Sequence, residues 1–201
     1  MNSILDDYAR LPLRVHSVLS DVRLHDVWAL DLPRMREGIT LHEFLLPGDS
    51  DSIELSPAAR ALFALRVALG KAFGWDRESG TGKASFASRL SDQERQDSLV
   101  PVGTRDGVFQ IVYQLENERL SEIENRTVHA AKLEALVEEE HRYRFYLAIY
   151  VRDIGVITSV YMAAIEPFRR WIVYPSFLRG ILGRWNRAFP VAAERNSEPR
   201  F

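Results

Sequence analysis

Two side chains in this sequence interrupt apolar patterns and have the chemistry of a general acid or base. His129 shares one face of a period-2 pattern with Leu133 and Val137, and Asp26 breaks an alternating apolar run. A histidine or carboxyl group in a pocket can transfer protons. The plainer alternatives are a hydrogen-bonded core histidine and a solvated aspartate at a strand surface. Both residues are therefore candidate catalytic groups, each with a structural alternative.

Other polar motifs do not form a metal or nucleotide site. The stretch Glu138–His141 (EEEH) puts adjacent carboxylates in a turn, which favours a solvated hairpin tip over a metal site. The GTGK stretch at 80–83 lacks the Walker spacing, because Arg77 and Ala84 occupy positions that need Gly and Ser or Thr. The histidines show no i, i+4 pair, so no zinc site and no cofactor are expected.

Aromatic side chains form the second group with binding chemistry. Their rings can line a ligand cavity and their hydroxyl groups can mark its polar points, although such residues also fill ordinary cores. Arg169 is the one cation among the expected pocket residues, and its orientation, into the pocket or toward solvent, is left open. The expected ligand-pocket residues are Trp28, Tyr113, Tyr146, Tyr150, Tyr161, Ile165, Phe168 and Arg169.

The stretch from Pro167 to Arg187 is locally basic. It holds five arginines and no acidic residue, interleaved with Trp171, Phe177 and Trp185. Such a surface suits an anionic membrane or an acidic protein partner. The alternative is a solvated helix face with cations near its C-terminus.

Composition indicates a globular domain without a nucleic-acid partner. The 201 residues are 46% hydrophobic and 27% charged, and the net charge is -2. We expect one domain over 1–190 and a disordered tail over 191–201. The chain has no cysteine, no signal-peptide pattern at its start and no apolar run near the ~20 residues of a membrane span. A cytoplasmic protein is therefore expected.

The first elements follow from periodicity and capping. Apolar residues on even positions from Val22 to Leu32 predict a half-buried strand. Thr40, followed three residues later by Glu43, has the spacing of a capping box and predicts a short helix. An apolar stripe and good terminal residues predict a longer helix over 56–74.

The middle of the chain is predicted to be a loop followed by strands. The polar segment 76–106 indicates a flexible loop, with a short helix where Ser91 precedes Glu94. Alternation predicts a strand over 107–115, then a weaker strand that ends near residue 125. The segment 128–140 has helix-favouring residues but also a period-2 pattern, so its own residues leave helix and strand open.

The last elements are a strand and a helix. Alternation predicts a long strand over 141–151 with aromatic residues on both faces. Apolar residues every three or four positions predict an amphipathic helix over 157–172, which Pro167 would bend. A second apolar set continues beyond Pro175. This order suits an α+β helix-grip fold, in which a curved antiparallel sheet wraps a long C-terminal helix.

Two stretches carry a resemblance to a known family. RALFALRVALGKAFGW (60–75) and YMAAIEPFRRWIVYPSFLRGI (161–181) resemble the bacterial domain-of-unknown-function family 2867, grouped with START-like (SRPBCC, Bet v 1-like) proteins. The resemblance runs from about residue 21 to about 181 and implies that 128–140 is a strand. The chain departs from the family pattern at Arg169, and at Asn125, Thr127 and His129, where the family often has an Asp-x-His-x-Asp-like strand.

The resemblance implies a binding function. START-like proteins bind hydrophobic or aromatic small molecules, and some catalyse cyclisation, aromatisation or dehydration in the cavity. We therefore expect a hydrophobic or aromatic ligand between the sheet and the C-terminal helix. A cyclase, isomerase or dehydratase without cofactor is the first alternative. A membrane-surface or protein interaction module is the second, and homo-oligomerisation stays open.

Overall fold

An antiparallel sheet forms the centre of the protein. The computed structural model describes residues 4–46, 84–124, 129–152, 167 and 169–190. Within these ranges the sheet has six strands in the order β1-β6-β5-β4-β3-β2. The strands are β1 (Arg23–Pro33), β2 (Arg105–Asp106), β3 (Phe109–Gln114), β4 (Glu118–Glu124), β5 (His129–Glu138) and β6 (Arg142–Arg152).

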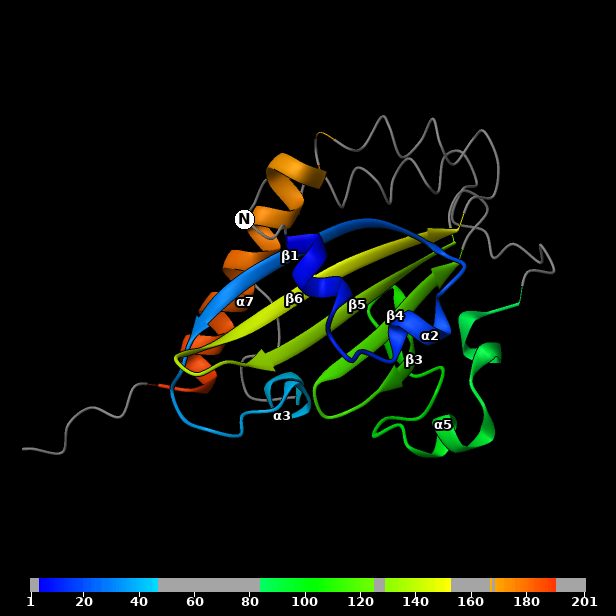
Figure 1. The fold of residues 1–201 in the computed structure, drawn as a ribbon, viewed down its shortest axis with the longest axis horizontal. Coiled ribbons are helices and arrows are strands. Elements are labelled where there is room, and N and C mark those ends of the chain that lie inside the picture. The colour runs from blue at the N-terminus through cyan, green and yellow to red at the C-terminus, as the bar shows by residue number, and fades with distance from the viewer. Residues whose placement is uncertain (1–3, 47–83, 125–128, 153–166, 168, 191–201) are drawn as a thin grey trace, which may run out of the picture.

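Helices lie on both faces of the sheet. Helix α7 crosses one face beside β1 and β6, whereas α1 and α2 lie over the other face (Figure 1). The fold is therefore α+β, with an open antiparallel sheet and a C-terminal helix. The helical elements are α1 (Ile4–Ala9), α2 (Val15–Val18), α3 (Leu41–Leu45), the 3-10 helix η1 (Phe86–Arg89), α5 (Asp92–Gln96), the π-helix η2 (Arg169–Val173) and α7 (Tyr174–Ala188).

The ambiguous segment 128–140 is a strand where it is described. Strand β5 pairs with β4 from His129 to Ala135 and with β6 along its whole length. Pairing on both sides satisfies its backbone groups, and this outweighs the weak helix preference of its alanine, leucine and glutamate residues. The strand prediction is confirmed.

Two β-bulges correct the predicted strand faces. The register shifts between Leu24 and Asp26 in β1 and between Ile111 and Tyr113 in β3. An extra residue in one strand reverses the alternation beyond it. The prediction that all even positions of β1 share a face is therefore wrong: Leu24 packs with the α2 side of the sheet, and Trp28 packs with the α7 side.

Both predicted capping arrangements are present. Thr40 Oγ1 accepts a hydrogen bond of 3.1 Å from the Glu43 amide at the start of α3. Ser91 and Glu94 form a complete capping box at the start of α5. The described part of the polar loop, 84–106, contains η1, α5 and β2, and Phe86 of η1 is fully buried.

The C-terminal helix begins with a wide turn. Residues 169–173 are π-helical, and Pro175 lies at the start of α7. A proline lacks the amide that an α-helix needs, which suits the change of helix type at this point. Further along α7, Trp185 is fully buried and its Nε1 donates to the Pro33 carbonyl at 3.0 Å. Most of the helix predicted at 157–172 lies outside the described residues.

Two apolar clusters hold the layers together. The α7 side buries Leu32, Phe44, Phe145, Ile181 and Trp185, among others. The opposite side buries side chains of α1, α2 and η1 against the strands. The predicted helix at 56–74, the GTGK stretch and the tail at 191–201 lie outside the described residues.

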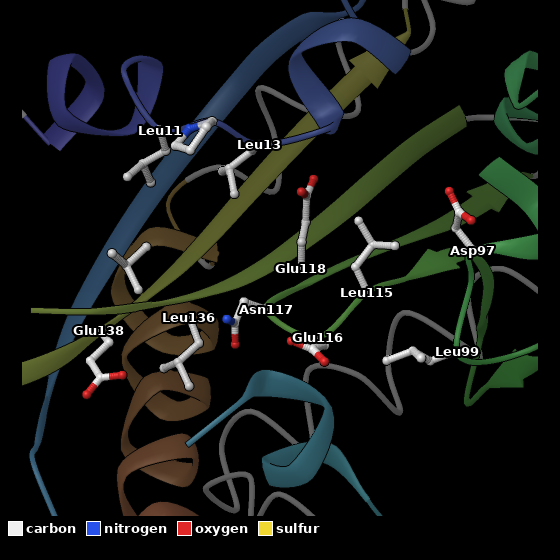
Figure 2. A pocket seen from close by; sticks show the side chains of 12 residues that line it. Leu11, Leu13, Asp97, Leu99, Leu115, Glu116, Asn117, Glu118, Leu136 and Glu138 are labelled. Carbon is white, nitrogen blue, oxygen red and sulfur yellow. The ribbon is translucent and has the colours of Figure 1, made fainter. Parts of the chain in front are cut away.

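A pocket of about 540 Å³ opens where β5 extends beyond the start of β4 (Figure 2). Its walls come from residues 11–13 before α2, from the segment after α5, from the β3–β4 turn and from the end of β5. In the described part of the chain, no helix is long and apolar enough to cross a membrane.

Candidate functional site

Cross-strand register places polar side chains in two neighbouring rows on the face that carries α7. Residues directly opposite each other in antiparallel strands lie on the same face of the sheet. We call the two rows together the polar rows. The first contains Trp28, Leu147, Glu134 and Arg119, and the second contains Asp26, Ile149, Lys132 and Ser121.

Glu134 is the centre of the polar rows. Its side chain is fully buried, and its Oε2 accepts from Arg119 Nε at 2.8 Å and lies 2.6 Å from Arg119 Nη2. Lys132 Nζ lies 3.2 Å from the same oxygen. Arg119 Nη2 also reaches Asp106 Oδ2 of β2 at 3.2 Å. The two cations are therefore balanced by two carboxylates, one of them buried.

The cations decide the protonation state of this carboxyl group. Burial alone would raise the pKa of Glu134, but Lys132 and Arg119 outweigh it and hold the pKa below its ordinary value. Glu134 is therefore ionised at neutral pH. An ionised carboxylate only accepts hydrogen bonds, so any further partner of this group must be a donor.

Three buried polar atoms of the polar rows have no hydrogen-bond partner among the residues that the structure describes. They are Trp28 Nε1, Glu134 Oε1 and Ser121 Oγ. The indole nitrogen is a donor, the carboxylate oxygen is an acceptor, and the hydroxyl group can act as either. Because buried polar atoms are nearly always paired, three such atoms on one face of four strands are unusual.

Side chains of α7 and β3 border the rows. Tyr174 packs its ring 5.0 Å from that of Trp28 and donates its hydroxyl hydrogen to Asp26 Oδ2 at 3.3 Å. Lys132 Nζ lies 5.0 Å from the ring centre of Phe109 and 6.0 Å from that of Phe177. The first turn of α7 therefore faces the rows with aromatic rings.

The polar rows combine unsatisfied hydrogen-bonding atoms with an aromatic border. They offer one donor, one acceptor and one hydroxyl group beside aromatic rings.

Comparison with known proteins identifies a family but names no ligand. The family described as "protein of unknown function (DUF2867)" matches residues 18–176. The chain belongs to this family. No curated protein and no solved structure matches the chain.

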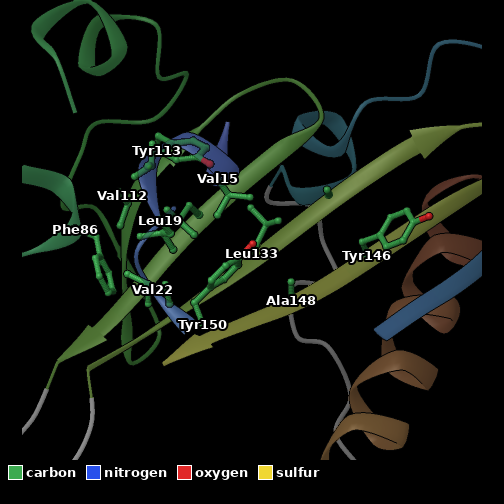
Figure 3. Packing of buried hydrophobic residues seen from close by; sticks show 14 of the residues in the cluster. Val15, Leu19, Val22, Phe86, Val112, Tyr113, Leu133, Tyr146, Ala148 and Tyr150 are labelled. Atoms are coloured by element: carbon green, nitrogen blue, oxygen red, sulfur yellow. The ribbon is translucent and has the colours of Figure 1, made fainter. Parts of the chain in front are cut away.

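Three of the tyrosines expected in one pocket of this DUF2867 protein lie on the other face. Tyr113, Tyr146 and Tyr150 belong to the buried cluster on the α2 side, where Figure 3 shows Tyr113 and Tyr150 near Val15 and Leu19. The bulge in β3 turns Tyr113 to this side, and alternation along β6 turns the other two. They do not share the α7 face with Trp28, which corrects the sequence interpretation.

The hydroxyl groups of Tyr113 and Tyr150 have hydrogen-bond partners within the fold. The Tyr113 hydroxyl donates to Glu118 Oε1 at 2.5 Å, and burial, with Glu118 nearby, raises the Tyr113 pKa well above its usual value. The hydroxyl groups of Tyr8 and Tyr150 lie 2.8 Å apart. Burial raises the pKa of Tyr150 to about 12. These phenols are therefore neutral core residues at physiological pH.

The two candidate catalytic residues lie on opposite faces. Asp26 belongs to the polar rows, whereas His129 is fully buried on the α2 side. The His129 ring stacks on Phe86 at 4.1 Å, and its Nε2 lies 3.0 Å from Glu122 Oε2. They cannot act together on one substrate in this arrangement.

The remaining predicted pocket residues are not placed. Tyr161, Ile165 and Phe168 lie outside the described residues, as does the side chain of Arg169. In the ranges that the structure describes, no group of three histidine or acidic side chains could hold a metal ion.

The sequence interpretation missed Glu134, Lys132 and Arg119. The signal was present in β5, where Lys132 and Glu134 alternate with Ala131, Leu133 and Ala135. Once the segment is a strand, both charged residues must lie on the face opposite the apolar one. Only the register of β4 then reveals that Arg119 lies beside Glu134.

Proposed function

We propose that this chain is a START-like, helix-grip protein that binds a hydrophobic or aromatic small molecule between the sheet and α7. The observation that carries the proposal is the set of three unpartnered atoms in the polar rows: Trp28 Nε1, Glu134 Oε1 and Ser121 Oγ. The open antiparallel sheet with a C-terminal helix on one face is compatible with that fold.

The energetic reason is the cost of leaving buried polar atoms unpaired. Each such atom costs about 1–3 kcal/mol relative to a paired one. The Glu134 carboxylate is ionised and both of its cations contact Oε2, so Oε1 still needs a hydrogen-bond donor. A ligand hydroxyl or amino group at this point would remove the cost.

Register sets the approximate size of the ligand. Trp28 and Glu134 stand on either side of Leu147, two strands apart in one row. Two strand spacings are about 10 Å, the length of a two-ring aromatic molecule. Such a ligand would accept from Trp28 Nε1, donate to Glu134 Oε1 and cover Leu147. Ser121 is a diagonal neighbour of Glu134, within reach of the same polar group.

The test is native mass spectrometry of the protein purified from its own host. We expect a mass increment from one retained small molecule, lost on denaturation. Its exact mass should match a compound that has an aromatic body and a hydroxyl or amino group. Protein that carries no ligand, and that binds none from a host metabolite extract, contradicts the proposal.

Two matched tryptophan variants locate the ligand. Trp28→Phe keeps an aromatic ring and removes the unpartnered Nε1, so retained ligand should fall with little change in stability. Trp185→Phe removes the same atom from a fully buried tryptophan whose Nε1 already donates to Pro33. The lost bond and the smaller ring should lower stability by about 2–4 kcal/mol, and the ligand should be kept. Equal ligand occupancy in both variants would place the ligand elsewhere.

Membrane-surface binding is a second candidate, favoured by one observation. Trp171 is 77% exposed, and Arg170, Arg179 and Arg187 are exposed along η2 and α7. Exposed tryptophan and arginine residues are typical of interfacial helices. Flotation with vesicles that contain an anionic lipid should then show binding at low salt that high salt and Trp171→Ser weaken. Binding that depends on neither variable contradicts this candidate.

A further inference from the structure

The pocket beside the free end of β5 is separate from the polar rows. It has a volume of about 540 Å³, within the range of ligand pockets. Strand β4 begins opposite Ala135, so the last residues of β5 extend past it and form one wall. Besides Pro12 and the β5 residues Leu136 and Val137, the apolar lining contains Leu11, Leu13, Leu99 and Leu115. Figure 2 shows them around the acidic residues of the β3–β4 turn.

All charged residues in the described lining of the pocket are acidic. They are Asp97, Glu116, Glu118 and Glu138, and no lysine, arginine or histidine is among the described lining residues. A pocket that has apolar walls and only carboxylates selects for a cationic group on an apolar body.

Only one of the four carboxylates is paired with a cation among the described residues. Glu138 pairs with Arg34 at 2.9 Å. Asp97 Oδ1 accepts from the neutral amide of Gln93 at 2.8 Å. The carboxylate of Glu116 is engaged by none of the hydrogen bonds or ion pairs of the described residues, and this residue is solvent-exposed. The pocket therefore keeps an uncompensated negative charge.

Glu118 gives the pocket a rigid acidic wall. Its side chain is buried, and it accepts from the Arg14 and Val15 amides at 2.8 and 2.9 Å and from the Tyr113 hydroxyl at 2.5 Å. None of these donors is a cation, so the negative charge of Glu118 is solvated by dipoles and still attracts a positive ligand. The same bonds fix the segment before α2 against the sheet, which preforms this wall.

We propose that this pocket binds a small apolar molecule that carries a protonated amine. The ammonium group lies between Glu116 and Glu118, and the apolar body packs on Leu13, Leu99 and Leu115. The site is independent of the ligand proposed between the sheet and α7, because no residue of the polar rows lines it.

Two fluorescent probes that differ in charge test the proposal. Dansylcadaverine has an aromatic body and a primary amine, and dansylglycine has the same body and a carboxylate. We expect the amine to bind at least about tenfold more tightly, with affinity that falls in high salt. Equal affinity for the two probes, or tighter binding of dansylglycine, would overturn the proposal.

A charge reversal with a matched control places the probe. Glu116→Lys should weaken dansylcadaverine binding about tenfold and strengthen dansylglycine binding. Glu140→Lys makes the same change at a hairpin tip outside the pocket, where the side chain is 88% exposed, and should leave both affinities unchanged. If the two lysine variants behave alike, the amine does not bind here.

A variant in the polar rows separates the two proposed sites. Trp28→Phe should not alter dansylcadaverine binding, whereas a loss of binding in this variant would assign the probe to the polar rows instead.

Discussion

Strands β4 and β5 bury a glutamate on each face of the sheet, and the two carboxylates are held differently. On the α7 face, Glu134 receives all its contacts on Oε2, from Arg119 and Lys132, and has none on Oε1. On the opposite face, Glu122 Oε1 accepts from Ser85 Oγ. Its Oε2 accepts from the Phe86 amide at 2.9 Å and meets His129 Nε2 at 3.0 Å.

The difference separates a carboxylate whose two oxygens both have partners within the fold, Glu122, from one that can still accept a hydrogen bond, Glu134. Glu122 uses both oxygens to fasten η1 and β5 together, so its hydrogen bonding is complete within the fold. Glu134 is balanced in charge but incomplete in hydrogen bonds, which is the condition expected of a binding group before its ligand arrives. Burial alone does not distinguish the two, because both side chains are almost fully enclosed.

The largest effect should follow from Glu134→Ala. It leaves Arg119 and Lys132 in the interior without their buried counter-ion, which should cost about 3–5 kcal/mol in the free energy of unfolding. Urea denaturation at neutral pH measures it. If the alanine variant does not fold, Glu134→Gln keeps one acceptor and should cost about 2 kcal/mol.

The matched control for this change is Asp106→Ala. Asp106 contacts the same two cations, but its side chain is 39% exposed, so its removal should cost less than about 1 kcal/mol. Similar losses of unfolding free energy in the two variants would show that burial does not determine how much Glu134 stabilises the protein.

The next effect concerns the opposite face. In Glu122→Gln one carboxylate oxygen becomes an NH2 group, which must face either Ser85 Oγ or the pair formed by the Phe86 amide and His129 Nε2, so the acceptor on that side is lost. We expect a loss of about 2–3 kcal/mol and faster hydrogen exchange at the Phe86 amide. Retention of the small molecule by the folded variant should not change. Loss of the ligand here, with exchange unaltered, would reverse the roles assigned to the two faces.

Acid titration gives a smaller effect per carboxylate. Burial opposes ionisation of both groups, but their partners hold the pKa of Glu122 and of Glu134 below the ordinary value of 4.5. A lowered folded-state pKa adds stability above the unfolded-state pKa, and this stability disappears as the pH falls through the folded-state value. Each group should contribute a slope of up to about 1.4 kcal/mol per pH unit below pH 4.5.

The two glutamine variants assign these slopes. Urea denaturation between pH 2 and 6 should show one carboxylate's slope missing from Glu122→Gln and from Glu134→Gln. An unchanged slope in either variant would mean that the carboxyl group concerned does not titrate differently in the folded and unfolded protein.

Strand periodicity explains how much of the fold the sequence predicts. The strands around Trp28 and Phe145 were predicted because side-chain alternation is a local property. The residues around Leu133 left helix and strand open, and the family resemblance implied the strand. The faces of β1 and β3 were not predicted, because a bulge changes the face without changing the apolar pattern on either side. Tyr113 was therefore assigned to the wrong layer.

The candidate site was predicted only in part. Trp28 and Asp26 were identified because one is aromatic and the other interrupts an apolar run. Glu134 and Arg119 were not, because their meaning comes from the pairing of β4 with β5. Fifteen positions separate them in the sequence, and the same charges on a helix would be ordinary surface residues.

The smallest stability change gives the sharpest test of the comparison. Ser121 Oγ is buried and unpartnered, so Ser121→Ala removes a desolvated hydroxyl group without breaking a bond. We expect the unfolding free energy of the empty protein to stay within about 0.5 kcal/mol or rise by up to 1 kcal/mol. Ser98→Ala should instead cost about 1 kcal/mol, because Ser98 Oγ donates to the Val100 carbonyl and accepts from the backbone amide of Gln114.

Of the two serine variants, only Ser121→Ala should reduce the amount of retained ligand. If it destabilises the protein as much as Ser98→Ala does, its hydroxyl group is paired within the fold and belongs, like Glu122, to the structural side of the comparison.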